Sequence, residues 1–143
     1  MLRQYRMFAA YNRWANTQVY AAAAELSDAE FRSDRGAFFG SLHRTLNHLL
    51  VADRIWMKRF TGTGEAPTTL DAVLFEELDA LAAARKAEDE RIIAWTGMLD
   101  DRTLAANFTY VTVVQPVEIT QPLSAALAHF FNQGGVNAAP DGG

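Results

Sequence analysis

One amphipathic segment, from Ser41 to Thr61, constrains the fold of this chain more than any other feature of the sequence. It contains no Pro or Gly, and its apolar residues recur every three or four positions, which is the spacing of one helix face. Ser41 can cap the start of this helix. The apolar face is formed by Leu42, Leu46, Leu49, Leu50, Trp56, Met57 and Phe60. The pattern therefore predicts a long helix packed along one side.

Two polar residues interrupt this apolar face. Asp53 falls in its middle, where a carboxylate is costly unless a donor binds it, so we expect Asp53 to be at least half-buried and paired with an arginine, an amide or a histidine N–H. His48 lies at the edge of the face, one turn from the small residues Thr45 and Ala52, which leaves room for a ligand on the imidazole. We expect this imidazole to point into the bundle, toward the start of the last helix.

The same periodicity predicts two more long helices, one over residues 2–26 and one that begins after Thr69 and ends near Gly97. Asn12 lies on the apolar face of the first helix and is expected to be a buried amide with a specific partner. In the third helix, Arg85 and Glu88 are close enough to form an ion pair.

The chain changes character after the third helix. Residues 108–120 are rich in β-branched and aromatic side chains and predict a small β-hairpin or an extended crossover. Pro122 suits the first turn of a last, short helix that ends near Asn132, before a Gly/Pro-rich tail over residues 136–143. The sequence therefore predicts an all-α four-helix bundle, with a long crossover before its shortened last helix, in a single domain over residues 1–143.

Composition argues against several classes of function. The formal net charge of −4 disfavours general binding to nucleic acids and to anionic membranes. The chain has no cysteine, so any thiol in its chemistry would come from a substrate. It shows neither a signal peptide nor an apolar run of transmembrane length, and we expect a cytoplasmic protein.

The three histidines are the candidate metal ligands. His43 points away from the apolar face and is expected on the surface. His48 lies on the second long helix and His129 on the short last helix, and helical bundles build metal sites from inward side chains on facing helices. A catalytic zinc site needs about three protein ligands, and Asp53 is the nearest carboxylate in the sequence to supply or support one. On spacing alone, two core histidines without a metal are the alternative interpretation.

Three blocks of residues, 11–16 (YNRWAN), 48–56 (HLLVADRIW) and 121–132 (QPLSAALAHFFN), resemble the DinB/YfiT-like metalloenzymes. These three blocks occur in the family's order and spacing, and together they span nearly the whole chain. The resemblance implies a four-helix bundle, usually dimeric, with a divalent metal held by three histidines, one of which matches His48. It implies Zn or Ni, or else Fe or Mn, as the metal. Relatives include transferases and isomerases that use low-molecular-weight thiols such as bacillithiol or mycothiol.

The chain departs from the family pattern in its last helix. The family usually has two further histidines there, four residues apart and followed by Arg-Gly-Gln, whereas here Asn132 is followed directly by Gln133. Either the protein has lost this segment or the sequence as given omits it, and His129, one turn earlier, is an imperfect substitute. We expect an omitted run of about ten to fifteen helical residues, which would separate the Cα atoms of Asn132 and Gln133 by roughly 15–22 Å instead of about 3.8 Å.

These observations predict one of two functions. The first is a metal-dependent S-transferase or hydrolase acting on a small molecule, with His48 and His129 as metal ligands and with Asp53 and Asn12 as supporting residues; the metal would polarise a thiol or a water. The alternative is a metal-free, catalytically inactive dimeric bundle that serves as a structural or binding module. In both cases the apolar surface of the first helix predicts a homodimer through the first or the third helix.

Overall fold

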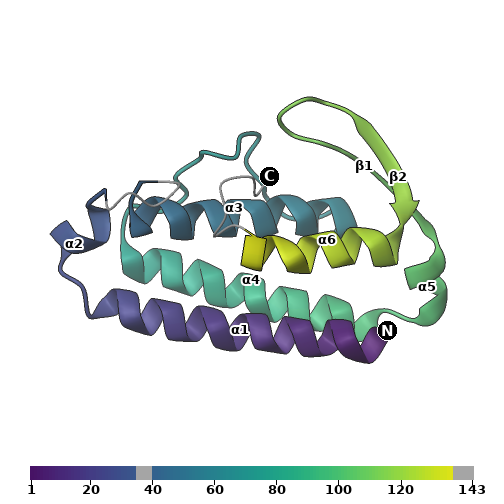
Figure 1. Ribbon diagram of the computed structural model, residues 1–143, viewed down its shortest axis with the longest axis horizontal. Helices are drawn as coiled ribbons and strands as arrows, with labels where there is room; N and C mark the ends of the chain where they lie inside the picture. Colours follow the sequence, from purple (N-terminus) through teal and green to yellow (C-terminus); the bar gives the residue numbers. More distant parts are fainter. Residues whose placement is uncertain (35–39, 137–143) are drawn as a thin grey trace.

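The computed structural model describes residues 1–34 and 40–136, and for residues 133–136 it describes the backbone alone. Three long helices run side by side (Figure 1). They are α1 (Leu2–Ala24), α3 (Leu42–Thr61) and α4 (Leu78–Met98). The fourth helix of the bundle, α6 (Leu123–Val136), is shorter and lies along only part of α3 (Figure 1). The described chain is therefore mostly helical, with the short fourth helix that the sequence predicted.

Two short helices and one hairpin connect the long helices. The capping box of Ser27 and Glu30 starts α2 (Asp28–Arg32), and the side chain of Asp100 caps α5 (Asp101–Ala105), which was not predicted. Strands β1 (Asn107–Val111) and β2 (Glu118–Pro122) pair antiparallel, with Asn107 opposite Pro122. Of the two predicted alternatives for this stretch, the hairpin is the one observed. It leads directly into α6 (Figure 1).

The third long helix begins later than predicted. The expected start after Thr69 is wrong, because α4 begins at Leu78 and the preceding residues form a loop. In this loop the N–H groups of Leu74 and Phe75 donate to the Asn47 side chain at 2.9 and 3.1 Å. These two N–H groups thus bind a side chain of α3, and the helix starts only after them.

The last helix continues beyond its predicted end. α6 runs without interruption from Leu123 to Val136, so the expected stop after Asn132 and the expected separation of Asn132 from Gln133 are both wrong. Glycine inside a helix costs about 1 kcal/mol relative to alanine, which weakens this last turn without ending it. Of the expected tail over residues 136–143, residues 137–143 lie outside the described part of the chain.

The core consists of two apolar clusters along the bundle. The cluster nearer the hairpin contains Tyr5, Ala9, Trp56, Met57, Ile92, Leu99, Leu104, Leu123, Ala126, Leu127 and Phe130. The cluster nearer α2 contains Ala23, Phe31, Leu46, Leu50 and Leu81. In α3 and α4 the residues between these clusters include Asp53, Arg85 and Asp89, so the polar side chains fall at the middle of the bundle.

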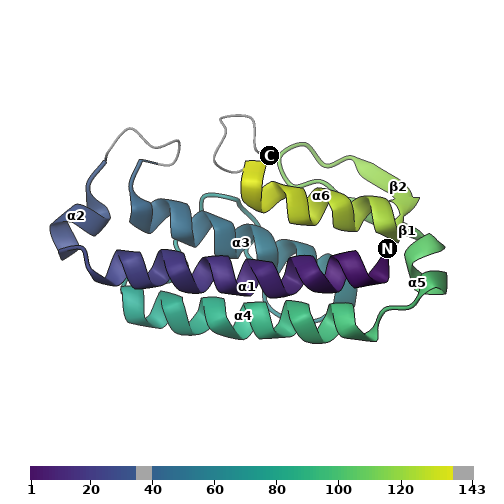
Figure 2. The ribbon, with the colours of Figure 1, turned by 60° about the horizontal axis from the view of Figure 1, so that its bottom comes forward.

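Exposed side chains of α1 form the apolar surface that predicted a dimer. Met7, Tyr11 and Trp14 are 62, 63 and 58% exposed, and the rings of Tyr11 and Trp14 are 5.7 Å apart. Figure 2 shows α1 on the near side of the bundle. The homodimer itself stays a prediction. Within the described residues, no helix combines the length and apolar character needed to span a membrane.

Candidate functional site

A buried ion-pair cluster connects the middle of α3 to the middle of α4. Arg85 Nη2 donates to Asp53 Oδ2 at 2.6 Å, and Arg85 Nε donates to Asp89 Oδ1 at 2.9 Å. The side chains of Arg85 and Asp89 are only 4 and 2% exposed, whereas that of Asp53 is 19% exposed. The prediction that Asp53 is at least half-buried and bound by a donor is therefore confirmed, and the donor is Arg85.

Two amides of α1 complete the cluster on the side of Asp89. Asn16 Nδ2 donates to both carboxylate oxygens of Asp89 at 3.1 Å, and Asn12 Nδ2 donates to Oδ1 at 3.3 Å. The prediction that Asn12 has a specific partner is confirmed, although its amide is half-buried and not fully buried. Sequence analysis missed Asn16 and Asp89. Their signal was the four-residue spacing of Asn12 with Asn16 and of Arg85 with Asp89, which places each pair on one helix face.

The predicted ion pair between Arg85 and Glu88 is wrong. Glu88 pairs with Arg91, whose Nη1 lies 3.2 Å from Glu88 Oε2, while Arg85 is bound by Asp53 and Asp89. The Arg85 guanidinium is already bound by Asp89, four positions later on α4, and by Asp53 of α3. Glu88 therefore pairs with Arg91, three positions after it.

Burial and mutual charge determine the ionisation of this cluster. Burial raises the pKa of Asp53 and of Asp89 above the ordinary value, and the charge of Arg85 partly offsets this effect. For Arg85, burial lowers the pKa, but the two carboxylates outweigh burial and raise it. Burial also raises the pKa of the nearby Tyr20 to about 12. With both carboxylates ionised, two negative charges and one positive charge leave the cluster with a net charge of −1.

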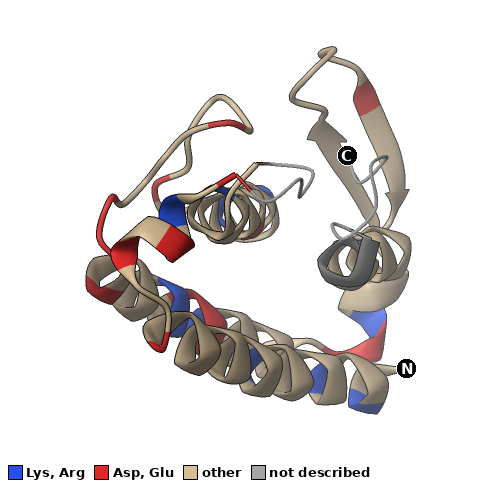
Figure 3. Cartoon of the chain, turned by 60° about the vertical axis from the view of Figure 1, so that its left-hand side comes forward, with Lys and Arg blue, Asp and Glu red and all other residues tan. Residues whose placement is uncertain are grey.

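Asp53, Arg85 and the two amides of the cluster form the polar floor of a cavity of about 380 Å³ bordered by α1, α3, α4 and α6, and Asp89 lies buried behind them. Its apolar walls are Phe8, Tyr11, Ala15, Val19, Leu49, Phe130 and Phe131. Its polar lining is Asn12, Asn16, Asp53, Arg85 and Asn132. We call this space the central cavity. The stretch Leu123–Val136 contains no Asp, Glu, Lys or Arg, so α6 adds no charged side chain to it (Figure 3).

The predicted metal ligand His48 is buried, as expected, with only 5% of the residue exposed. Its Nδ1 lies 3.1 Å from the carbonyl oxygen of Leu70, in the loop between α3 and α4. It borders a second cavity, of about 350 Å³, together with Arg44 and Asp71. The imidazole thus faces this loop, where we expected it to face the start of α6.

The other predicted ligand, His129, is exposed, and its ring lies 5.4 Å from that of Trp56. It borders a third cavity, of about 500 Å³, which extends along the hairpin. Leu70 lines both this cavity and that of His48, and so lies between the two sites. Over residues 1–34 and 40–136, no three His, Cys, Asp or Glu side chains are grouped closely enough to hold a metal ion.

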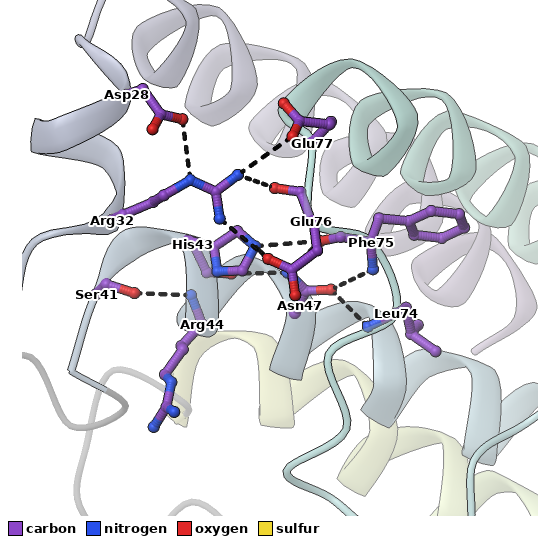
Figure 4. Close-up of polar contacts among 10 residues, drawn as sticks. All are labelled: Asp28, Arg32, Ser41, His43, Arg44, Asn47, Leu74, Phe75, Glu76 and Glu77. Atoms are coloured by element: carbon purple, nitrogen blue, oxygen red, sulfur yellow. Dashed lines mark hydrogen bonds and ion pairs between the residues drawn. The ribbon is translucent and has the colours of Figure 1, made fainter.

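The expectation that His43 lies on the surface is wrong. The residue is 6% exposed, and its Nε2 lies 3.2 Å from the carbonyl oxygen of Phe75 (Figure 4). The ring of Phe31 meets the imidazole edge to face, with the two ring centres 5.4 Å apart. The packing of α2 over the start of α3 therefore buries His43, and the periodicity of α3 alone did not reveal it.

Asn47, which sequence analysis missed, organises the loop before α4 (Figure 4). Its Oδ1 accepts from the N–H groups of Leu74 and Phe75, and its Nδ2 donates to the carbonyl oxygens of His43 and Phe75 at 3.0 and 3.1 Å. Only 1% of Asn47 is exposed. This amide fixes the loop, and thereby the position of α4, relative to α3.

The fold and this site define a helical-bundle protein with a charged cluster at the floor of a cavity. The chain belongs to the DinB family, whose family model matches residues 1–134. It is similar to Protein DinB of Bacillus subtilis (strain 168), with 26% identity over 140 residues, covering 87% of this chain and 74% of that protein. The resemblance noted in the sequence is therefore confirmed.

Proposed function

We propose that this chain is a binding module of the DinB family that takes a small molecule in the central cavity. A volume of about 380 Å³ lies within the range of small-molecule sites, which are mostly apolar with a few placed polar groups. The observation that carries the proposal is the combination of aromatic walls with one partly exposed carboxylate, Asp53, held in place by Arg85.

A metal-dependent transferase or hydrolase is the function that family resemblance favours, but the donors of this chain do not fit a three-ligand centre. Its three histidines are separated. His43 contacts the carbonyl oxygen of Phe75, His48 contacts the carbonyl oxygen of Leu70, and His129 is exposed. A catalytic zinc-type site needs about three protein ligands converging on one point. We therefore derive no metal chemistry from these residues and propose binding as the function.

Binding in the central cavity can be tested with a neutral fluorescent probe such as N-phenyl-1-naphthylamine, whose emission rises in apolar surroundings. Ala15 is half-buried and lines the cavity, so Ala15→Trp should fill part of it. We expect wild-type protein to bind one probe per chain, and Ala15→Trp to weaken binding at least about tenfold, because a filled cavity cannot accept the apolar ring.

The matched control is Ala94→Trp, which adds the same side chain at an exposed position of α4. It should leave probe binding unchanged. Equal binding by wild-type protein and by Ala15→Trp would place the probe in another cavity and contradict the proposal, as would an absence of binding to wild-type protein.

A further inference from the structure

The charge of the central cavity restricts the ligand it can take. Arg85 is the one cationic side chain among the described residues that line it, and its guanidinium is already bound by Asp53 and Asp89. Asp89 is 2% exposed and also accepts from Asn12 and Asn16. With Asp53 and Asp89 both ionised in their pairs with Arg85, the floor and the buried Asp89 behind it carry a net negative charge, and the positive group is turned toward these carboxylates.

Asp53 is the acidic group that a ligand can reach. Its side chain is 19% exposed and lines the cavity. Among the described residues, Arg85 donates a hydrogen bond to Oδ2 of this carboxylate. None of them donates a hydrogen bond to Oδ1. A carboxylate that is held by a guanidinium on one oxygen and open on the other is a ready acceptor for a charged N–H donor, and charge-assisted hydrogen bonds are the stronger kind.

The walls suit a cationic ligand with an apolar body. The ring centre of Phe131 lies 5.7 Å from that of Phe8 and 5.0 Å from that of Phe130, and these three neighbouring rings line the same cavity as Asp53. Aromatic faces attract cations as well as apolar groups, because the ring face is the negative part of its quadrupole.

We propose that the central cavity selects an organic cation: an ammonium group that donates to Asp53, attached to an aromatic or aliphatic body that packs against Phe8, Phe130 and Phe131. This inference rests on the proposed function, since it assigns the ligand class of the same cavity. An anionic ligand of the same shape would face the open oxygen of ionised Asp53, with ionised Asp89 behind it, and is disfavoured.

Three compounds of nearly equal size test the charge preference: 4-phenylbutylamine, 4-phenylbutan-1-ol and 4-phenylbutanoate. Each is titrated against the chain by calorimetry and by displacement of N-phenyl-1-naphthylamine. We expect the amine to bind about tenfold or more tightly than the alcohol, and the carboxylate to bind most weakly, because a hydrogen bond to a charged group in a shielded site is worth more than a neutral one. Asp53→Asn should bring the amine to the affinity of the alcohol.

A second pair of variants replaces no member of the ion-pair cluster. Leu49 is half-buried and lines the cavity, so Leu49→Lys places a positive charge beside the ligand, and Leu49→Gln is the neutral control. We expect Leu49→Lys to weaken binding of the amine more than binding of the alcohol. Leu49→Gln should still bind the amine more tightly than the alcohol. Equal affinities of amine and alcohol for wild-type protein would overturn the ligand class while leaving the cavity as a binding site. Failure of wild-type protein to bind N-phenyl-1-naphthylamine would instead count against the proposed function.

Discussion

Arg85→Met should lower the free energy of unfolding of this bundle by about 3–5 kcal/mol, the range for removing one partner of a buried ion pair. The substitution leaves the carboxylates of Asp53 and Asp89, with 19 and 2% of their side chains exposed, without the guanidinium that binds both. Since folded domains are stable by only about 5–15 kcal/mol, the loss should be plain in urea denaturation followed by circular dichroism.

Lys86→Met is the matched control, because Lys86 is the next residue of α4 and is exposed. Its effect should stay within about 0.5 kcal/mol. Adding Asp53→Asn and Asp89→Asn to Arg85→Met removes the unpaired charges, so the triple variant should regain much of the lost stability. A loss below about 1 kcal/mol for Arg85→Met alone would mean that the cluster does not hold α3 against α4.

Asn47→Ala should cost about 2–4 kcal/mol and loosen the loop before α4. The N–H groups of Leu74 and Phe75 would lose their acceptor, and each unsatisfied buried group costs about 1–3 kcal/mol. Amide hydrogen exchange should show the change directly, with faster exchange at Leu74 and Phe75 than in wild-type protein.

Asn107→Ala provides the comparison, because Asn107 is an exposed residue at the start of β1. It should leave both stability and the exchange of the loop amides unchanged. Unaltered exchange at Leu74 and Phe75 in Asn47→Ala would show that other contacts hold this loop.

Local signals were sufficient to predict most of the helices of this fold. The periodicity of residues 41–61 and the Ser41 cap are both contained in one segment of the chain, and both are observed in α3. The buried charge of Asp53 was also predictable, because a carboxylate in an apolar helix face must find a donor.

The partners of these residues could not be predicted, because they depend on how distant elements pack. Asp53 and Arg85 are 32 positions apart, and both stand at apolar positions of their helices, which hinted at a pair without identifying it. The late start of α4 depends on Asn47, which lies 27 positions before Leu74. No periodicity within one helix shows where its side chains meet another.

The histidines illustrate the same limit. Burial of His48 followed from its own helix, but its contact with Leu70 depends on the path of a loop, and the burial of His43 depends on α2. The position of His48 and His129 on two different helices suggested that they converge on a metal, whereas in the folded chain each borders a different cavity.

We propose that this chain binds a small molecule in the central cavity and that His48 is not part of a three-histidine metal centre. Equilibrium dialysis of the full chain against about 1 μM Zn²⁺ or Ni²⁺, followed by elemental analysis, tests it most directly, because a three-ligand site would be filled at such concentrations. We expect well under one ion per chain, with the same value for wild-type protein and for His48→Ala. One ion per chain in wild-type protein, lost in His48→Ala, would contradict the account.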